Sequence, residues 1–273
     1  MSSAAPLLAV DGDSLAHRAY HGLPKTIRLN AVVGFTNMLG RLWDELRPRA
    51  VMVGWDTLEV PTYRHLAFEA YQSGREFDDS LLEQLGMLPE LVQAFGFVAG
   101  KAPGYEADDF LGAAVRYEEE RGGTVLVATS DRDLFQLASE RTTLVVPVRG
   151  VSEIARVGPR EVRERYDVEP EQVPDFIALR GDPSDRLPGA RGVGPKKAAN
   201  VLREYGTLEA ALAAGRFAAE AEDLRLYRRI ATVDASAPLP PLPDQLPQWA
   251  EASALLANWG LGGVAERVAA WSK

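Results

Sequence analysis

The sequence has no cysteine among its 273 residues, which excludes disulfide bonds and thiolate metal sites. It has no run of about 18 apolar residues, the length that a membrane-spanning helix requires. No basic segment precedes the short apolar stretch near the N-terminus, so we expect no secretory signal peptide. These absences fit a reducing compartment, and we expect a cytoplasmic protein.

Histidine and positive charge are also scarce. The three histidines, His17, His21 and His65, have no partner at metal-ligand spacing, so we expect no zinc site and a structural role for His17 and His21. The net charge of −9 is unusual for a protein that binds nucleic acid. The net charge does not exclude binding to nucleic acid if the acidic residues gather in one site and bind divalent cations there.

What the chain does contain is the composition of a globular protein, with 46% hydrophobic and 25% charged residues. Short, Val-rich runs without polar alternation predict buried parallel strands, and helical segments lie between them. The predicted strands are Leu7–Val10, Ala50–Trp55 and Val125–Thr129, and the predicted helices are Val32–Leu46, Ser80–Phe95 and Glu106–Arg121. This alternation predicts an α/β fold with a mostly parallel sheet.

After about Gly158 the pattern becomes helical, so we divide the chain into a core of residues 1–158 and a helical region of residues 159–273. The five prolines of Ala237–Pro247 predict an extended connector. The predicted helices of this region are Pro159–Tyr166, Pro170–Leu179 and Lys196–Tyr205, with a terminal pair around Trp249–Asn258 and Val264–Trp271 that packs back on the core.

Acidic residues follow each predicted strand. The carboxyl ends of parallel strands meet at one edge of a sheet, so Asp11, Asp56 and Asp131 should converge there. One such residue alone is explained by a helix cap or a solvated polar face. Six further acids stand in similar contexts, namely Glu106, Asp108, Asp109, Asp133, Asp182 and Asp185. The nine together predict one metal site.

The nine carboxylates offer only oxygen ligands, which favours hard cations such as Mg²⁺ or Mn²⁺. They are too many for one Mg²⁺, which takes one or two carboxylates from a protein. We therefore expect two divalent cations that clamp a phosphodiester group.

A glycine-rich turn, Gly189–Lys197, leads into a helix, and the segment from Arg186 to Arg203 has five basic residues and no acid. Glycine lets the backbone approach a ligand closely, and a helix N-terminus offers N–H groups to phosphate. A plain loop between two helices is the alternative. The residues predicted to hold DNA phosphates without reading sequence are Arg186, Arg191, Gly192, Gly194, Lys196 and Lys197.

Together these motifs resemble one family. VDG at 10–12, GWD at 54–56, GYEADD at 104–109, TSDRD at 129–133, GDPSD at 181–185 and GxxGxGxK at 189–196 are similar in order and spacing to the 5′-nuclease domain of bacterial DNA polymerase I, bacteriophage 5′-nucleases and flap endonucleases. The resemblance covers roughly residues 7–213. It implies a PIN-like (Rossmann-like) core, a helical arch at about residues 57–90 and a helix–hairpin–helix at about residues 186–213.

The resemblance also implies roles for single residues. Tyr71 and Arg75 match arch residues that guide a displaced strand, Tyr71 by stacking, and Arg75 is a candidate catalytic residue as well. The family binds K⁺ at its helix–hairpin–helix. Asp11, Glu106, Asp108, Asp109 and Asp131 match the more tightly held metal site, and Asp56, Asp133, Asp182 and Asp185 match the second site and water-mediated ligands.

Two positions depart from the family pattern. Gln72 stands where the arch has a lysine, which predicts a weaker grip on a single-stranded 5′ end. Arg186 stands where an asparagine is common, and we expect it to add a phosphate contact.

The function implied is a two-metal-ion 5′ nuclease of DNA replication and repair that leaves a 5′-phosphate and a 3′-hydroxyl. Expected substrates are DNA with a 5′ flap, a nick or a free 5′ end, and RNA primers. We expect a monomer that binds no membrane, associates with the nucleoid and cooperates with a separate DNA polymerase.

Two other functions compete with this one. Asp11–Ser14 also resembles the nucleophile motif of haloacid dehalogenase-type phosphatases, but the lysine that those enzymes need is missing between Ala102 and Pro195. A catalytically silent reader of DNA structure is the second alternative, although it would have no need of nine acids.

Overall fold

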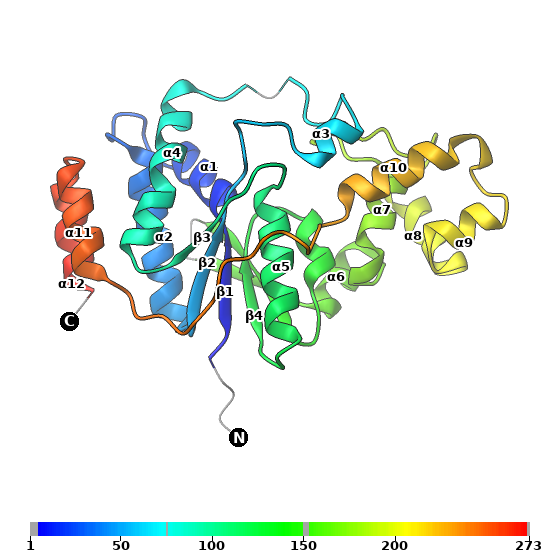
Figure 1. Cartoon of the computed structure of the whole chain (residues 1–273). Helices are drawn as coiled ribbons and strands as arrows, with labels where there is room; N and C mark the ends of the chain where they lie inside the picture. The colour runs from blue at the N-terminus through cyan, green and yellow to red at the C-terminus, as the bar shows by residue number, and fades with distance from the viewer. Residues whose placement is uncertain (1–4, 75, 150–152, 272–273) are drawn as a thin grey trace.

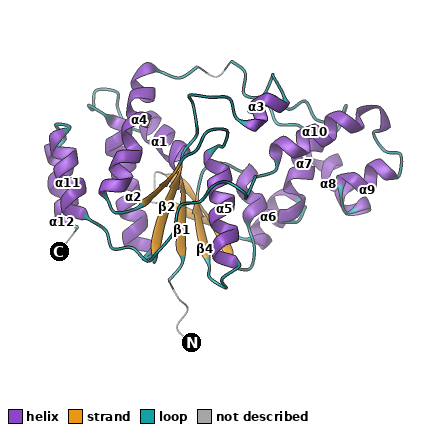
Figure 2. Ribbon diagram, viewed as in Figure 1, coloured by secondary structure: helices purple, strands orange, loops and turns teal. Residues whose placement is uncertain are grey.

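A six-stranded sheet lies at the centre of the N-terminal half of the chain (Figure 2). Its order is β3-β2-β1-β4-β5-β6, with neighbouring strands parallel except for β6, which pairs antiparallel with β5. The computed structural model describes residues 5–74, 76–149 and 153–271. The strands are β1 (Leu7–Asp11), β2 (Ala50–Gly54), β3 (Val98–Gly100), β4 (Val125–Ala128), β5 (Thr142–Arg149) and β6 (Glu153–Val157).

The central strands are apolar along their whole length because helices cover both faces of the sheet. Successive side chains of a strand point to opposite faces. Accordingly, Leu7 and Ala9 pack in one cluster with α5 (Ala107–Glu119), and Leu8 and Val10 pack in the other with α1 (Gly12–Gly22) and α2 (Asn30–Leu46). The predicted α/β class and the three predicted strands are confirmed.

The second half of the chain is helical. Its segments are α6 (Pro159–Tyr166), α7 (Val173–Arg180), α8 (Pro195–Tyr205), α9 (Leu208–Ala213), α10 (Ala221–Ala231), α11 (Trp249–Asn258) and α12 (Gly262–Ala270), with three 3-10 turns, η1 (Asp133–Leu137), η2 (Pro170–Gln172) and η3 (Ala218–Glu220). Every helix predicted for this half is found, although the segment predicted as Pro170–Leu179 is divided into η2 and α7.

The proline-rich connector crosses the molecule from α10 to α11 (Figure 1). The Gln245 N–H donates to the Arg49 carbonyl, and the Gln245 side chain accepts from the Val51 N–H, so the connector is fastened beside β2. The terminal pair then packs against α4 (Asp79–Ala94), where the rings of Trp249 and Phe95 lie 5.7 Å apart. The expectation that this pair returns to the core is confirmed.

The segment between β2 and α4 passes above the carboxyl ends of the strands and contains the short helix α3 (Tyr63–Ala67) (Figure 1). The arch was predicted for residues 57–90, but α4 begins at Asp79 and buries Leu81, Leu85 and Leu88 in the core. The raised part is therefore shorter than predicted. Among the described residues, no helix is both long enough and apolar enough to cross a membrane.

Candidate metal centre

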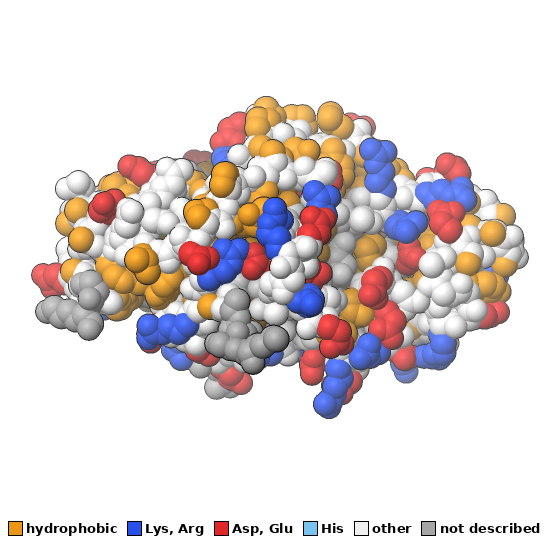
Figure 3. All heavy atoms as spheres, turned by 60° about the horizontal axis from the view of Figure 1, so that its bottom comes forward, with side chains coloured by type: hydrophobic (Ala, Val, Ile, Leu, Met, Phe, Trp, Pro, Cys, Tyr) orange, Lys and Arg blue, Asp and Glu red, His pale blue; other side chains and the backbone are white. Residues whose placement is uncertain are grey.

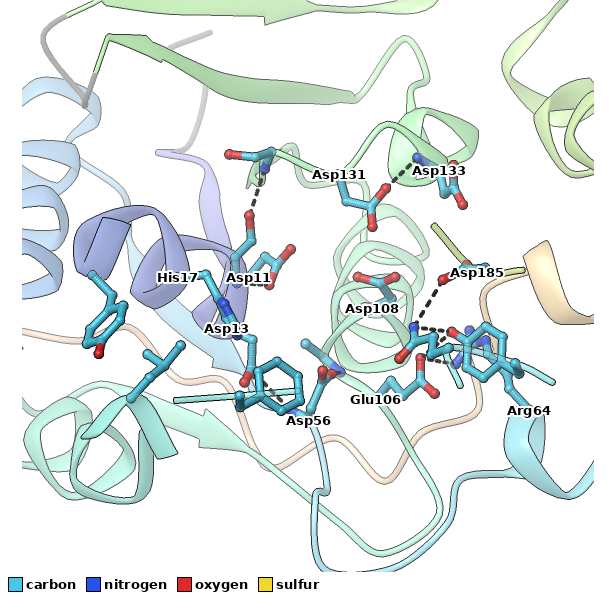
Figure 4. A pocket seen from close by; sticks show the side chains of 18 of the residues that line it. Asp11, Asp13, His17, Asp56, Arg64, Glu106, Asp108, Asp131, Asp133 and Asp185 are labelled. Atoms are coloured by element: carbon cyan, nitrogen blue, oxygen red, sulfur yellow. Dashed lines mark hydrogen bonds and ion pairs between the residues drawn. The ribbon is translucent and has the colours of Figure 1, made fainter. Parts of the chain in front are cut away.

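A pocket of about 670 Å³ opens at the carboxyl ends of β1, β2 and β4 (Figure 4). It collects carboxylates from segments far apart in the sequence, as the strand-end argument predicts. Seven of the nine predicted acids line it, namely Asp11, Asp56, Glu106, Asp108, Asp131, Asp133 and Asp185. Asp109 and Asp182 do not.

Asp11 ends β1 and caps α1, which gives its carboxylate a fixed orientation. It accepts a hydrogen bond from the Ser14 N–H (2.9 Å) and another from the Thr129 hydroxyl (2.7 Å). Burial raises the pKa of Asp11 to about 7, against the effect of these hydrogen bonds, and repulsion from Asp56 and Asp131 adds to the rise. The ionised form of Asp11 is therefore short of compensating positive charge.

Asp13 lines the same pocket, although the sequence suggested it only as part of a phosphatase motif. Its carboxylate accepts from the Asp56 N–H (2.8 Å), and the Asp56 carboxylate accepts from the Ala107 N–H (2.8 Å). Burial raises the pKa of Asp13 well above its ordinary value, and repulsion from Asp56 raises it further. Its spacing two residues after Asp11, in the first turn of a helix, was the signal that could have identified it.

Glu106 is held by three neighbours. The Thr62 hydroxyl donates to one carboxylate oxygen (2.7 Å), the Tyr71 hydroxyl donates to the other (2.9 Å), and Arg64 lies 3.3 Å from that second oxygen. All three neighbours come from the raised segment between β2 and α4. Glu106 therefore joins that segment to the wall of the pocket.

Asp109 was predicted as a metal ligand, but the structure turns it away from the pocket. It is fully buried and receives two hydrogen bonds from the Arg64 guanidinium (2.8 and 2.9 Å). It also accepts from the backbone N–H groups of Glu106 (3.1 Å) and Asp234 (2.9 Å). The reason is local: an acid at the third position of a helix folds back onto the N-cap, as in a capping box.

The remaining acids form a second group around Asp133. Burial raises the pKa of Asp133 well above its usual range, with further repulsion from Asp131, Asp182 and Asp185. Burial likewise raises the pKa of Asp108, and there the repelling neighbours are Asp131, Asp11 and Asp56. Asp131 therefore interacts both with the first group of acids, which is Asp11, Asp13, Asp56 and Asp108, and with the second group around Asp133. It lies on the same side of the pocket as Asp133 in Figure 4.

Asp182 lies behind this second group and does not face the pocket. Its carboxylate is 3.1 Å from the Arg180 guanidinium and accepts from the Ser184 N–H (2.8 Å). It was predicted among the second-site and water-mediated ligands, and its position outside the pocket leaves the water-mediated role as the one that stays a prediction. Its charge raises the pKa of Asp133.

The donor set of the pocket fits hard divalent cations, since the eight carboxylates named above line it together with Glu76 and Asp78, and burial leaves several of them short of positive charge. Among the described residues, no group of three or more His, Asp and Glu side chains stands close enough together to hold a metal ion as it is.

The two described arch residues occupy positions that the sequence did not predict. Only 3% of the Tyr71 surface is exposed and its hydroxyl is committed to Glu106, so the ring has no open face on which a base could stack. The Gln72 amide donates to the Tyr71 hydroxyl (2.7 Å) and to Asp185 (3.1 Å). The prediction for Arg75 lies outside the described residues.

The predicted phosphate clamp is exposed, as its role requires. Gly194 caps α8, which begins at Pro195, so the first turn of α8 opens to solvent beside Lys196. The Lys197 ammonium folds back and donates to the Gly192 carbonyl (2.9 Å), and the Arg191 N–H donates to Glu220 (2.9 Å). Arg186 is likewise exposed, on the turn after Asp185.

Charges of both signs are interspersed over the face of the molecule seen in Figure 3. No single basic or acidic patch dominates that face. The gathering of ten acidic residues in one pocket is a local feature of the molecule.

Comparison with known families gives two adjoining matches. The 5′-3′ exonuclease N-terminal resolvase-like domain matches residues 6–167, and the 5′-3′ exonuclease C-terminal SAM fold matches residues 168–252. Together they include both groups of carboxylates and the clamp.

Curated relatives include DNA polymerase I of Bacillus caldotenax, 41% identical over 213 residues, which are 76% of this chain and 24% of that protein. DNA polymerase I, thermostable, of Thermus thermophilus is 38% identical over 249 residues, 85% of this chain and 29% of that protein. The chain thus spans about a quarter of the length of these relatives.

Solved structures with the same fold include bacteriophage T5 5′-exonuclease with bound zinc, at 18% identity and a TM-score of 0.71, covering 98% of this chain and 100% of that one. The catalytic core of Rad2 in complex with a DNA substrate has 15% identity and a TM-score of 0.62, covering 99% and 91%. These likenesses confirm the predicted PIN-like core followed by a helical region.

Proposed function

Because this chain belongs to the 5′-3′ exonuclease family, we propose that it hydrolyses DNA phosphodiester bonds near 5′ ends, as a metal-dependent 5′-3′ exonuclease and flap endonuclease. The observation that carries the proposal is the gathering of carboxylates from the carboxyl ends of β1, β2 and β4 in one pocket.

Two such groups suit two divalent cations, Mg²⁺ or Mn²⁺. When bound, these ions would lower the pKa of a water and stabilise the charge that develops on the phosphoryl group. Asp11, Asp13, Asp56 and Asp108 would hold one ion, Asp133 and Asp185 the other, and Asp131 would lie between them. Glu106, fixed by Thr62 and Tyr71, would orient a water or an ion at the edge of the first group.

The substrate follows from the surroundings of the pocket. The clamp offers exposed basic side chains and a helix N-terminus to duplex phosphates, which gives binding without sequence readout. The substrates that we propose are DNA with a 5′ flap, a nick or a free 5′ end, and RNA primers as members of the same class.

A K⁺ ion at the clamp would have to compete with the Lys197 ammonium for the Gly192 carbonyl. Cooperation with a separate DNA polymerase is part of the proposal, because the polymerase I relatives carry a similar region within longer chains. Association with the nucleoid would follow from binding to DNA.

The proposal is tested with a flap duplex labelled at its 5′ end, incubated with Mg²⁺, with Mn²⁺ and with chelator. We expect cleavage near the branch point with either ion and none with chelator. Tight flap binding without cleavage in any condition would instead support a silent reader of DNA structure.

A further inference from the structure

A basic pocket of about 690 Å³ lies between η1, α6, α7 and α8, separate from the pocket of the carboxylates. Two acids, Glu164 and Asp167, also line it, so cations outnumber acids there in a chain whose net charge is −9. The cations that line it are Arg132, Arg165, Arg180, Lys196 and Arg203.

Three of these cations are not neutralised by the protein. In the described parts of the chain, Arg132, Arg165 and Lys196 form no ion pair, whereas Arg203 pairs with Asp167 and Arg180 with Asp182. The Arg165 guanidinium lies 5.4 Å from the centre of the Phe135 ring, which holds the side chain in place without removing its charge.

The wall of the pocket is rigid. The rings of Tyr166 and Phe176 stack at 5.2 Å, and the Arg180 guanidinium lies 5.4 Å from the Phe176 ring. The Arg180 Nε is buried and has no hydrogen-bond partner in the described structure. A buried N–H without an acceptor is unfavourable. The Arg180 side chain lines the pocket, although its Nε is not open to solvent.

The position of the pocket indicates which anion. Arg132 stands between Asp131 and Asp133 of the metal centre, and Lys196 stands in the first turn of α8, at the clamp. The unpaired cations come from three different elements around one open groove. Such a spread matches successive phosphates of a strand better than one small anion.

We propose that this pocket is a second phosphate-binding site, which holds the backbone of the DNA duplex between the metal centre and the clamp. The inference rests on the proposed function, because it takes DNA as the ligand. Arg132, Arg165 and Arg180 bind phosphate oxygens, and these contacts fix how far the clamped duplex lies from the carboxylates.

The test measures binding of a flapped duplex over a series of salt concentrations, in chelator so that no strand is cut. We expect Arg132→Gln and Arg165→Gln each to raise the dissociation constant several-fold. Each should also reduce the slope of log affinity against log salt by about 1, and the double variant by about 2.

Three comparisons keep the test specific. Arg267→Gln removes an exposed charge from α12, at the opposite end of the molecule in Figure 1, and should leave the slope unchanged. Arg165→Lys keeps the charge and should recover most of the slope. Thermal unfolding of each variant shows whether the fold is intact.

The outcomes separate the two proposals. If Arg132→Gln and Arg165→Gln bind the flapped duplex as tightly as the unsubstituted chain does, the proposed second phosphate-binding site is wrong. The proposed nuclease function would not be affected by that result. An unsubstituted chain that binds no flapped duplex would overturn both.

Discussion

The acids of the segment Glu106–Asp109 have different tasks, although they are nearly adjacent. Asp108 faces the pocket, where burial and other carboxylates raise its pKa, whereas Asp109 is fully buried against Arg64. Arg64 also donates from Nε to the Ile230 carbonyl (2.9 Å), so it joins α3, the start of α5 and the end of α10. We infer that Arg64 and Asp109 position Glu106 and the raised segment, and that neither touches the substrate.

The first prediction concerns this buried pair. Asp109→Asn should leave Glu106 as the only acid paired with the buried Arg64 guanidinium and lower the free energy of unfolding by up to about 3–5 kcal/mol, measured by denaturant titration. Asp108→Asn should instead leave stability unchanged or raise it in metal-free buffer, because it removes a repelling charge from the pocket. Equal effects of the two substitutions on stability would contradict the assignment.

The second prediction concerns Gln72, whose amide contacts Asp185 and the Tyr71 hydroxyl. Gln72→Lys adds a cation at the edge of the pocket, so the affinity for a single-stranded 5′ flap should rise and become more salt-dependent. Gln72→Met, of similar size and without charge, is the matched control. Unchanged flap binding and cleavage in Gln72→Lys would refute the idea that Gln72 weakens the grip.

Part of the site was predictable residue by residue, and part was not. The strand-end rule identified Asp11, Asp56 and Asp131, because it depends only on local sequence and on a parallel sheet. The positions of Tyr71 and Arg64 were not predictable, because their partner Glu106 is more than 30 residues away and chain folding brings them together. Asp109 was misassigned because cap geometry, not composition, sets its direction.

At the scale of elements, β3, β5 and β6 were not predicted from the sequence, and of these only β5 contains a longer apolar run, Leu144–Val148. β3 has only three residues, and β6 is an edge strand with a mostly half-exposed pattern. The predicted strands β1, β2 and β4 are central, so covering helices impose a continuous apolar sequence on them. The sheet centre was therefore predictable and its edges were not.

The third prediction concerns the turn before α8. Gly189 has φ +72°, and a Cβ there would lie 2.3 Å from the Gly181 nitrogen, so Gly189→Ala must displace backbone. It should lower the unfolding temperature by several degrees and weaken duplex binding. Gly194 has φ −99° and open space around its Cβ position, so Gly194→Ala should change stability by less than about 0.5 kcal/mol. Equal unfolding temperatures for the two variants would contradict this reading of the turn.

At the scale of the whole molecule, the chain gathers acidic side chains in one pocket and basic side chains in another, between η1, α6, α7 and α8. The α/β core brings most of the acids together, and the helical region supplies Asp185, the clamp and most of the basic pocket. The connector and the terminal helices then brace the core from the opposite side. The sequence predicted that the last two helices pack back on the core, and the contact between the Trp249 and Phe95 rings confirms it.

The fourth prediction concerns pH and metal. Burial raises the pKa of Asp11 to about 7 and also raises the pKa values of Asp13, Asp108 and Asp133, so the folded state binds more protons than the unfolded state. For Asp11 this difference spans about pH 4 to pH 7. Their contribution to stability in metal-free buffer is therefore lost as pH rises through that window. Mg²⁺ at about 100 times its dissociation constant should restore about 2.7 kcal/mol.

Thermal unfolding with and without Mg²⁺ checks this prediction. The increase in unfolding temperature should be several degrees near pH 8 and much smaller near pH 5.5, where protons compete for the carboxylates. An increase of the same size at both pH values would show that Mg²⁺ binds elsewhere.

The most direct test of the central claim is single-turnover cleavage of a flap duplex in Mg²⁺ by the unsubstituted chain and by Asp131→Asn. Asp131 lies between the two groups of carboxylates, so its loss should slow cleavage by about 10²–10³-fold or more while DNA binding in chelator stays unchanged. A cleavage rate in Asp131→Asn close to that of the unsubstituted chain would contradict the account, because catalysis would then not depend on this pocket.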